Sequence, residues 1–201
     1  MKPEKVIQFA DGCTLEIYPD ENPENPRTEY DNLGKMICFH KRHDLGDKHD
    51  YKSGDYSGWD EIEDQIKQDN PDCLIRPLFL MDHSGLSISM GPFGCPWDSG
   101  QVGFIFITKE RIVGELKGGV QWAEKVLEAE VETYNQYLVG NIYRFILRDK
   151  PCEKCSGPGG ILNQSGGFYG DNPRYNGMSG NLKEKHRQEL RREIKYANVY
   201  K

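Results

Sequence analysis

Two turns in the middle of the chain carry residue types that could act as a nucleophile and its base. Asp82 and His83 stand in Asp-His-Ser-Gly, while Cys95 and Asp98 stand in Cys-Pro-Trp-Asp-Ser-Gly. A thiol beside an imidazole that an aspartate orients is the arrangement of a cysteine nucleophile. The same residues suit ordinary turns, because Asp and Ser accept hydrogen bonds from backbone amides, and Trp97 would then serve in packing. We prefer the turn interpretation and predict no catalytic residue.

A second concentration of polar donors is the sequence CFHKRHDLGDKHD, which begins at residue 38. His40 and His43 could share a zinc ion only if a helical turn replaced the strand that we expect there. Further along, Cys152 and Cys155 form a CxxC pair that supplies half of a zinc site, and no second pair lies near it in the sequence. We therefore predict a polar loop and two free thiols, with no metal and no other cofactor.

Acidic residues dominate the first third of the chain, although the net charge is only −6. Residues 1–72 carry 18 acidic against 9 basic side chains, whereas residues 181–201 carry 3 against 7. An acidic surface disfavours ordinary nucleic-acid binding and suits either simple solvation or a basic partner. We expect a binding surface formed by acids in the loops of this region: Glu21, Glu24, Glu29, Asp31, Asp44, Asp47 and Asp50.

The strands that must position these residues are predicted from hydrophobic alternation. Residues 5–9 and 14–18 flank Asp11-Gly12 and indicate an opening β-hairpin. The segment PDENPENPR contains three prolines and is expected to be an exposed loop. Further strands are predicted over residues 35–40, 74–81, 86–90, 102–108 and 141–148.

Three helices are predicted, of which the longest spans residues 122–138. Its apolar face is expected to consist of Trp122, Val126, Leu127, Val131, Tyr134 and Leu138. A shorter helix over residues 57–68 has Ser57 as a plausible N-cap, and a basic helix covers residues 181–196. We expect the long helix to pack against a sheet whose core includes Phe79, Leu80, Phe104 and Phe106.

Together these elements predict a single α+β domain over residues 1–180. It consists mostly of antiparallel sheet packed against the long amphipathic helix, with a Gly-rich loop over residues 151–180. The basic helix of residues 181–201 packs on this domain or extends from it. No stretch approaches the ~20 consecutive apolar residues of a membrane span, so we expect a cytoplasmic protein without a membrane partner.

Several long segments resemble a family of small proteins of unknown function encoded by bacteriophages, plasmids and other bacterial mobile elements. These segments are NPRTEYDNLGKMICFHKRHDLGD, FLMDHSGLSIS, GPFGCPWDSGQVGFIFITKE, AEVETYNQYLVGNIY and GFYGD. The resemblance covers roughly residues 5–171. It implies a bacterial host cytoplasm and a host protein as partner, for example a nuclease or its nucleic-acid complex, while direct nucleic-acid binding stays open.

The function expected from this resemblance is that of a non-enzymatic binding or inhibitor protein. Its target would be a nucleic-acid-directed defence effector of the host, such as a CRISPR or restriction nuclease. Two alternatives stay open: a small enzyme that uses Cys95 and His83, and a module that binds a nucleotide signal. Convergence of Cys95 and His83 in one pocket would favour the enzyme.

Overall fold

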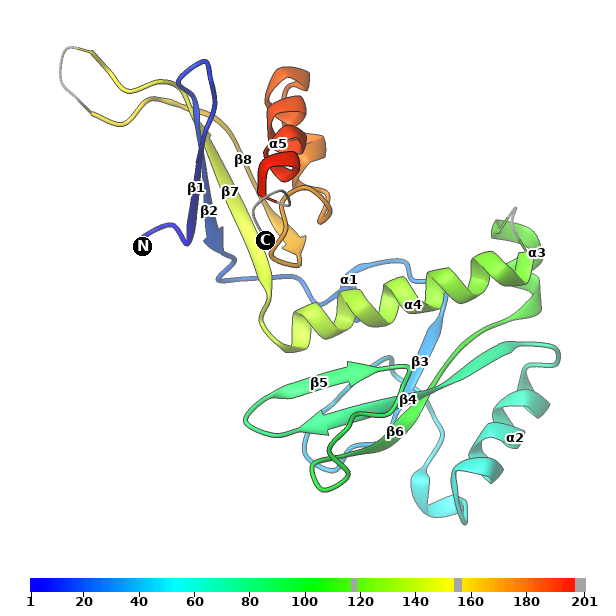
Figure 1. Ribbon diagram of the computed structural model, residues 1–201. Coiled ribbons are helices and arrows are strands. Elements are labelled where there is room, and N and C mark those ends of the chain that lie inside the picture. Colours follow the sequence, from blue (N-terminus) through cyan, green and yellow to red (C-terminus); the bar gives the residue numbers. More distant parts are fainter. Residues whose placement is uncertain (117–118, 154–156, 198–201) are drawn as a thin grey trace. The chain divides into compact units, whose positions relative to one another are not determined.

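The chain folds into two compact units, each with its own antiparallel sheet and its own helices (Figure 1). The computed structural model describes residues 1–116, 119–153 and 157–197. Unit 1 combines Met1–Glu24 with the described residues from Gly140 onward, and unit 2 is Asn25–Val139. The predicted antiparallel α+β class is confirmed. Among the described residues, no helix has the length and apolar character needed to cross a membrane.

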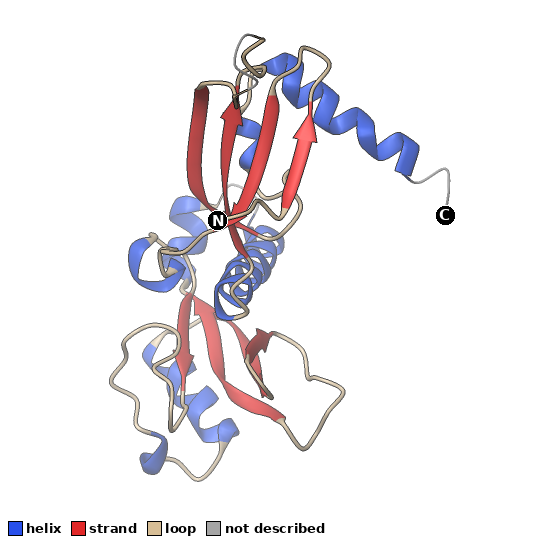
Figure 2. Ribbon diagram, turned by 90° about the vertical axis from the view of Figure 1, so that its left-hand side faces the viewer, coloured by secondary structure: helices blue, strands red, loops and turns tan. Residues whose placement is uncertain are grey.

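Unit 1 is built on a sheet with the strand order β1-β2-β7-β8. Figure 2 shows its four strands side by side. The strands are β1 (Lys5–Gln8), β2 (Thr14–Pro19), β7 (Ile142–Arg148) and β8 (Ile161–Tyr169). The opening hairpin is present as predicted, with Lys5 opposite Ile17 and Gln8 opposite Thr14. In β2 the side chains of Leu15 and Ile17 alternate onto the buried face of the sheet.

Residues 151–180, predicted to be mostly loop, also contain the strand β8, which the sequence analysis missed. Its first six residues are exposed, and Phe168 is its one buried side chain. The strand therefore lacks the apolar alternation by which a strand is recognised in a sequence. Its backbone pairing with β7, over Ile142 to Arg148, holds it at the edge of the sheet.

The C-terminal helix α5 (Glu184–Ala197) belongs to the core of unit 1. Leu182 and Leu190 pack in one cluster with Ile7, Leu15 and Phe145 of the sheet. A short 3-10 turn, η2 (Met178–Asn181), precedes the helix and adds a further buried methionine. Leu182, His186 and Leu190, which follow one another at intervals of four residues, are all buried, and the side chain of Ile194, the next residue at this interval, lies outside the described residues.

Unit 2 is a three-layer structure in which a sheet separates two helices (Figure 1). The sheet has the order β3-β6-β4-β5. Its strands are β3 (Lys35–Cys38), β4 (Leu74–Asp82), β5 (Leu86–Ser89) and β6 (Ser99–Ile107). Helix α4 (Gly119–Leu138) covers one face and helix α2 (Trp59–Asp69) covers the other. The remaining helices of the unit are α1 (Pro26–Glu29), η1 (Ser53–Asp55) and α3 (Lys109–Glu115).

Two residues inside the strands of unit 2 show how the local sequence suits its place. Pro77 lies where β4 has a neighbouring strand on one side only, because β5 begins to pair with β4 at Phe79, and an edge position of this kind tolerates a residue without an N–H. Gly103 lies where β6 runs close against β3, since a Cβ atom there would stand 1.8 Å from the carbonyl oxygen of Ile37. Only glycine fits that position without moving the backbone.

The predicted core residues of this sheet lie on both of its faces and not on one, which corrects the prediction. Leu80 packs under α4 as expected, but Phe104 and Phe106 point to the opposite face and pack with Ile62 and Ile66 of α2. Alternation along β6 explains the error, because neighbouring residues of a strand face opposite sides. Phe79 is only partly buried.

The buried face of α4 also differs from the prediction in one member. The residues that it buries completely are Ala123, Leu127, Val131 and Tyr134, while Val126 and Leu138 are partly buried at the side of the cluster. Trp122 is 56% exposed. A helix position one residue away from the apolar face is rotated by about 100°, so an apolar neighbour need not share its burial.

We expect Leu127→Ala to lower the free energy of unfolding by about 2–5 kcal/mol, because the fully buried side chain leaves a cavity. The matched control is Trp122→Ala on the same helix, which should change stability by less than about 1 kcal/mol. Urea denaturation measures both. Equal losses in the two variants would mean that the helix face is assigned wrongly.

Candidate functional site

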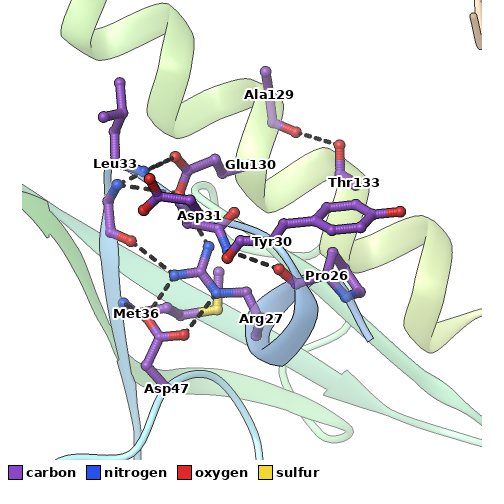
Figure 3. A network of polar contacts seen from close by, with 12 residues as sticks. Pro26, Arg27, Tyr30, Asp31, Leu33, Met36, Asp47, Ala129, Glu130 and Thr133 are labelled. Atoms are coloured by element: carbon purple, nitrogen blue, oxygen red, sulfur yellow. Dashed lines mark hydrogen bonds and ion pairs between the residues drawn. The ribbon is translucent and has the colours of Figure 1, made fainter. Parts of the chain in front are cut away.

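The guanidinium of Arg27 is buried between two carboxylates in unit 2 (Figure 3). Its Nε donates to Asp47 Oδ1 at 2.9 Å, and Nη1 donates to Glu130 Oε2 at 3.0 Å. Nη2 donates to Asp47 and to the carbonyl oxygen of Gly34 at 2.7 Å. The side chain of Arg27 is 1% exposed, so its charge is balanced inside the protein and is not offered to a ligand.

The two carboxylates of this network also hold the backbone around the start of β3. Asp47 accepts a hydrogen bond from the amide of Met36 at 2.7 Å, and Glu130 accepts one from the amide of Leu33 at 2.7 Å. A cleft of about 610 Å³ lies beside the network and is lined by residues such as Arg111 and Tyr51. Arg111 is itself paired with Glu115. The network is therefore structural. The charge of Arg27 is already paired within it and is not available to a ligand in the cleft.

The seven acids predicted as a binding surface are distributed over both units. Glu21 and Glu24 are exposed in unit 1. In unit 2 the exposed members are Glu29 on α1, Asp31 directly after it, and Asp44 and Asp50 in the loop after β3. Asp47 is the exception, because the Arg27 network uses its carboxylate. Six of the seven thus remain accessible to a partner.

A different set of polar residues meets at the ends of β4 and β6. The imidazole Nδ1 of His83 lies 3.1 Å from Asp98 Oδ2. The thiol of Cys95 donates to the same carboxylate oxygen at 3.6 Å. The backbone holds this meeting point together, since the amide of Asp82 donates to the carbonyl oxygen of Asp98 at 2.9 Å. The structure therefore brings Cys95, His83 and Asp98 together, as the alternative of an enzyme requires.

The order of these groups differs from that of a cysteine nucleophile. In such a site the imidazole stands between the sulfur and the acid. Here Asp98 stands between Cys95 and His83, and the side chain of His83 is 68% exposed. The hydroxyl of Ser99 donates to the carbonyl oxygen of Cys95, which is the backbone bonding expected of a turn.

The loop after β3 brings two basic side chains to the same rim. His40 Nε2 lies 3.6 Å from Asp82 Oδ2, and Arg42 forms an ion pair with the same carboxylate. Burial, reinforced by the neighbouring His43, lowers the pKa of His40 below its usual value. We name the set His40, Arg42, Asp82, His83, Cys95, Trp97 and Asp98 the β-rim.

Trp97 is the residue of the β-rim whose role differs most from the prediction. It was expected to pack, yet it is 93% exposed. It lies at a pocket of about 350 Å³ that His40, Asp82 and Asp98 also line. The signal for exposure is present in the sequence, because Trp97 stands between a proline and the polar run Asp-Ser-Gly, with no apolar periodicity around it.

Among the donors of the CFHKRHDLGDKHD segment, His40 and His43 stay together, while His49 and Cys38 have other surroundings. The rings of His40 and His43 stack at 5.1 Å, while His49 Nε2 lies 3.1 Å from the carbonyl oxygen of Cys38. Burial raises the pKa of the Cys38 thiol to about 12. Of the CxxC pair, Cys152 is exposed and Cys155 lies outside the described residues.

No family model, no curated protein and no solved structure matches this chain.

We expect Asp47→Asn to destabilise unit 2 by about 3–5 kcal/mol, because it leaves the buried guanidinium of Arg27 with half of its charge partners. Asp44→Asn is the matched control in the same loop, where the acid is exposed, and should change stability by no more than about 0.5 kcal/mol. Thermal denaturation compares the two. A stable Asp47→Asn variant would contradict the structural role of the network.

Proposed function

We propose that the chain is a non-enzymatic binding protein whose recognition surface is the β-rim of unit 2. The observation that carries this proposal is the exposed indole of Trp97 at the mouth of a polar pocket. Tryptophan is enriched among the few residues that supply most of the energy of protein interfaces. A side chain of this size that contacts mostly water is stabilised when a partner covers it.

The groups around Trp97 favour a protein partner over the backbone of a nucleic acid. The cation of Arg42 is already paired with Asp82, and Asp98 adds a further carboxylate beside the indole. A surface that binds phosphates needs unpaired cations, whereas an aromatic centre within a polar rim is typical of protein interfaces.

The exposed acids of the same unit support a basic partner. Asp44 and Asp50 lie in the loop that also carries His40 and Arg42. Complementary charge at the edge of an interface speeds encounter with a basic surface. The resemblance to proteins of mobile elements directs the proposal to a bacterial host protein, and a nuclease of a defence system, with its basic nucleic-acid channel, is the class to test first. Binding there would inhibit the nuclease.

We expect Trp97→Ala to weaken binding to such a nuclease by at least about 30-fold, as for a central interface residue. Trp122→Ala is the matched control, because it removes another exposed tryptophan from the same unit. Purified nucleases are first screened for capture by the immobilised protein. The affinity of each variant for a captured nuclease is then measured by titration. Equal affinity of the two variants would overturn the proposed surface, and failure of every nuclease class with retained folding would overturn the proposed partner.

A second candidate function is the cysteine enzyme, which the convergence of Cys95 and His83 on Asp98 favours. If His83 served as the base for Cys95, His83→Ala would slow the reaction of that thiol with iodoacetamide. We expect the rate in His83→Ala to equal that of the unmodified chain, because the thiol contacts Asp98 and not the imidazole. Mass spectrometry of the Cys95 peptide measures the rate, and a clear slowing would favour the enzyme.

A further inference from the structure

Three side chains with different donor atoms meet in unit 1, away from the β-rim. Asp11 lies in the turn of the β1–β2 hairpin, Cys13 directly precedes β2, and His186 lies in the first turns of α5. A carboxylate oxygen, the sulfur and one ring nitrogen of these residues all lie within 4.8 Å of one another. Segments 175 residues apart in the sequence therefore converge on one small volume.

Burial distinguishes this cluster from an ordinary surface ion pair. The side chain of His186 is 1% exposed, and Cys13 is also buried. His186 Nε2 lies 2.8 Å from Asp11 Oδ2, while the buried Nδ1 has no hydrogen-bond partner. The ring is held in place by stacking on Phe9, with the ring centroids 4.3 Å apart. Nε2 therefore faces the carboxylate of Asp11 in a fixed orientation.

A fourth donor approaches the sulfur. The carboxylate oxygen Oδ1 of Asp149, directly after β7, is 3.9 Å from Cys13 Sγ. Asp149 is exposed at the surface, so its side chain can adjust its position. Thiolate, imidazole and two carboxylates make up a set of four donors of the types that bind zinc.

The separations are close to those that a metal ion requires. Zinc lies about 2.3 Å from sulfur and about 2.0–2.1 Å from nitrogen or oxygen, so tetrahedral donors stand roughly 3.3–3.6 Å apart. Among Asp11, Cys13 and His186 the pair of Asp11 and His186 would open from 2.8 Å, and the widest separation of at most 4.8 Å would close. Asp149 lies outside this group of three, so its exposed side chain would turn towards the other donors. Lys185 Nζ, 2.5 Å from Asp11 Oδ2, is the competing cation. Its side chain is 56% exposed and can turn into the solvent.

We propose that Asp11, Cys13 and His186, with Asp149 as the fourth ligand, bind a divalent transition metal, with zinc as the preferred ion. Four protein donors close the coordination sphere, as in structural zinc sites. The thiol releases its proton when the metal binds, because the thiolate is the ligand. The bound ion would fasten α5 and the end of β7 to the β1–β2 hairpin.

The test adds Zn²⁺ or Co²⁺ to the full chain after treatment with a chelator. We expect one equivalent to bind, with thiolate-to-cobalt charge-transfer absorption that Cys13→Ser abolishes. Asp149→Asn changes an exposed residue, so it tests the site without disturbing the core, and should weaken zinc binding at least about tenfold. Zinc should raise the melting temperature of the unmodified chain and leave that of Cys13→Ser unchanged.

The double variant Cys152→Ser/Cys155→Ser is the matched control, because it removes two thiols that the proposed site does not use. It should bind cobalt with unchanged affinity and spectrum. Loss of binding in this variant with retention in Cys13→Ser would assign the metal to the CxxC pair and overturn the proposal. Absence of any binding to the unmodified chain would also overturn it, leaving Asp11, Lys185 and His186 as an ion-pair cluster only.

Discussion

The buried charge of Arg27 is the constraint on which the architecture of unit 2 depends. A guanidinium that is removed from water must be neutralised completely, and Asp47 and Glu130 do so from a loop and from α4. The same carboxylates bind the amides of Leu33 and Met36. One desolvated cation thereby determines where α4, the loop after β3 and the start of the strand lie relative to one another. Neither carboxylate alone neutralises the buried guanidinium, so the arginine needs both of these partners.

Close approach at the sheet adds a second constraint within the same unit. Gly34 brings the chain against α4, because a Cβ atom there would stand 2.5 Å from Leu127. Gly103 allows β6 to lie against β3 in the same way. With the sheet covered on both faces by α4 and α2, little polar chemistry can occupy its centre. The polar groups that remain available are presented by the loops at the strand ends.

The two polar clusters, the β-rim and the cluster of unit 1, therefore differ in their exposure to solvent. The β-rim is largely exposed, and its carboxylates already pair with Arg42 and His83, which suits recognition of a partner that covers an aromatic centre. The cluster of Asp11, Cys13 and His186 is mostly buried and joins distant segments of unit 1. Burial of unlike donors around one volume suits an ion more than a macromolecule. Whether a cluster lies at the surface or in the interior thus determines what kind of ligand it can bind.

The sequence by itself determined the local elements of this protein. The β1–β2 hairpin, most strands of unit 2 and helices α2, α4 and α5 follow from periodicity and turn residues, because these signals depend on neighbours within a few positions. Only the tertiary structure decided the partners of charged and polar groups. Asp47 looks like any loop acid in the sequence, and only the fold shows that it neutralises Arg27 together with Glu130, which lies 103 residues from that arginine. Likewise β8 lacks apolar alternation, and its pairing with β7 makes it a strand. The physical reason is that hydrogen bonds and ion pairs depend on distance in space, which a pattern of neighbours does not contain.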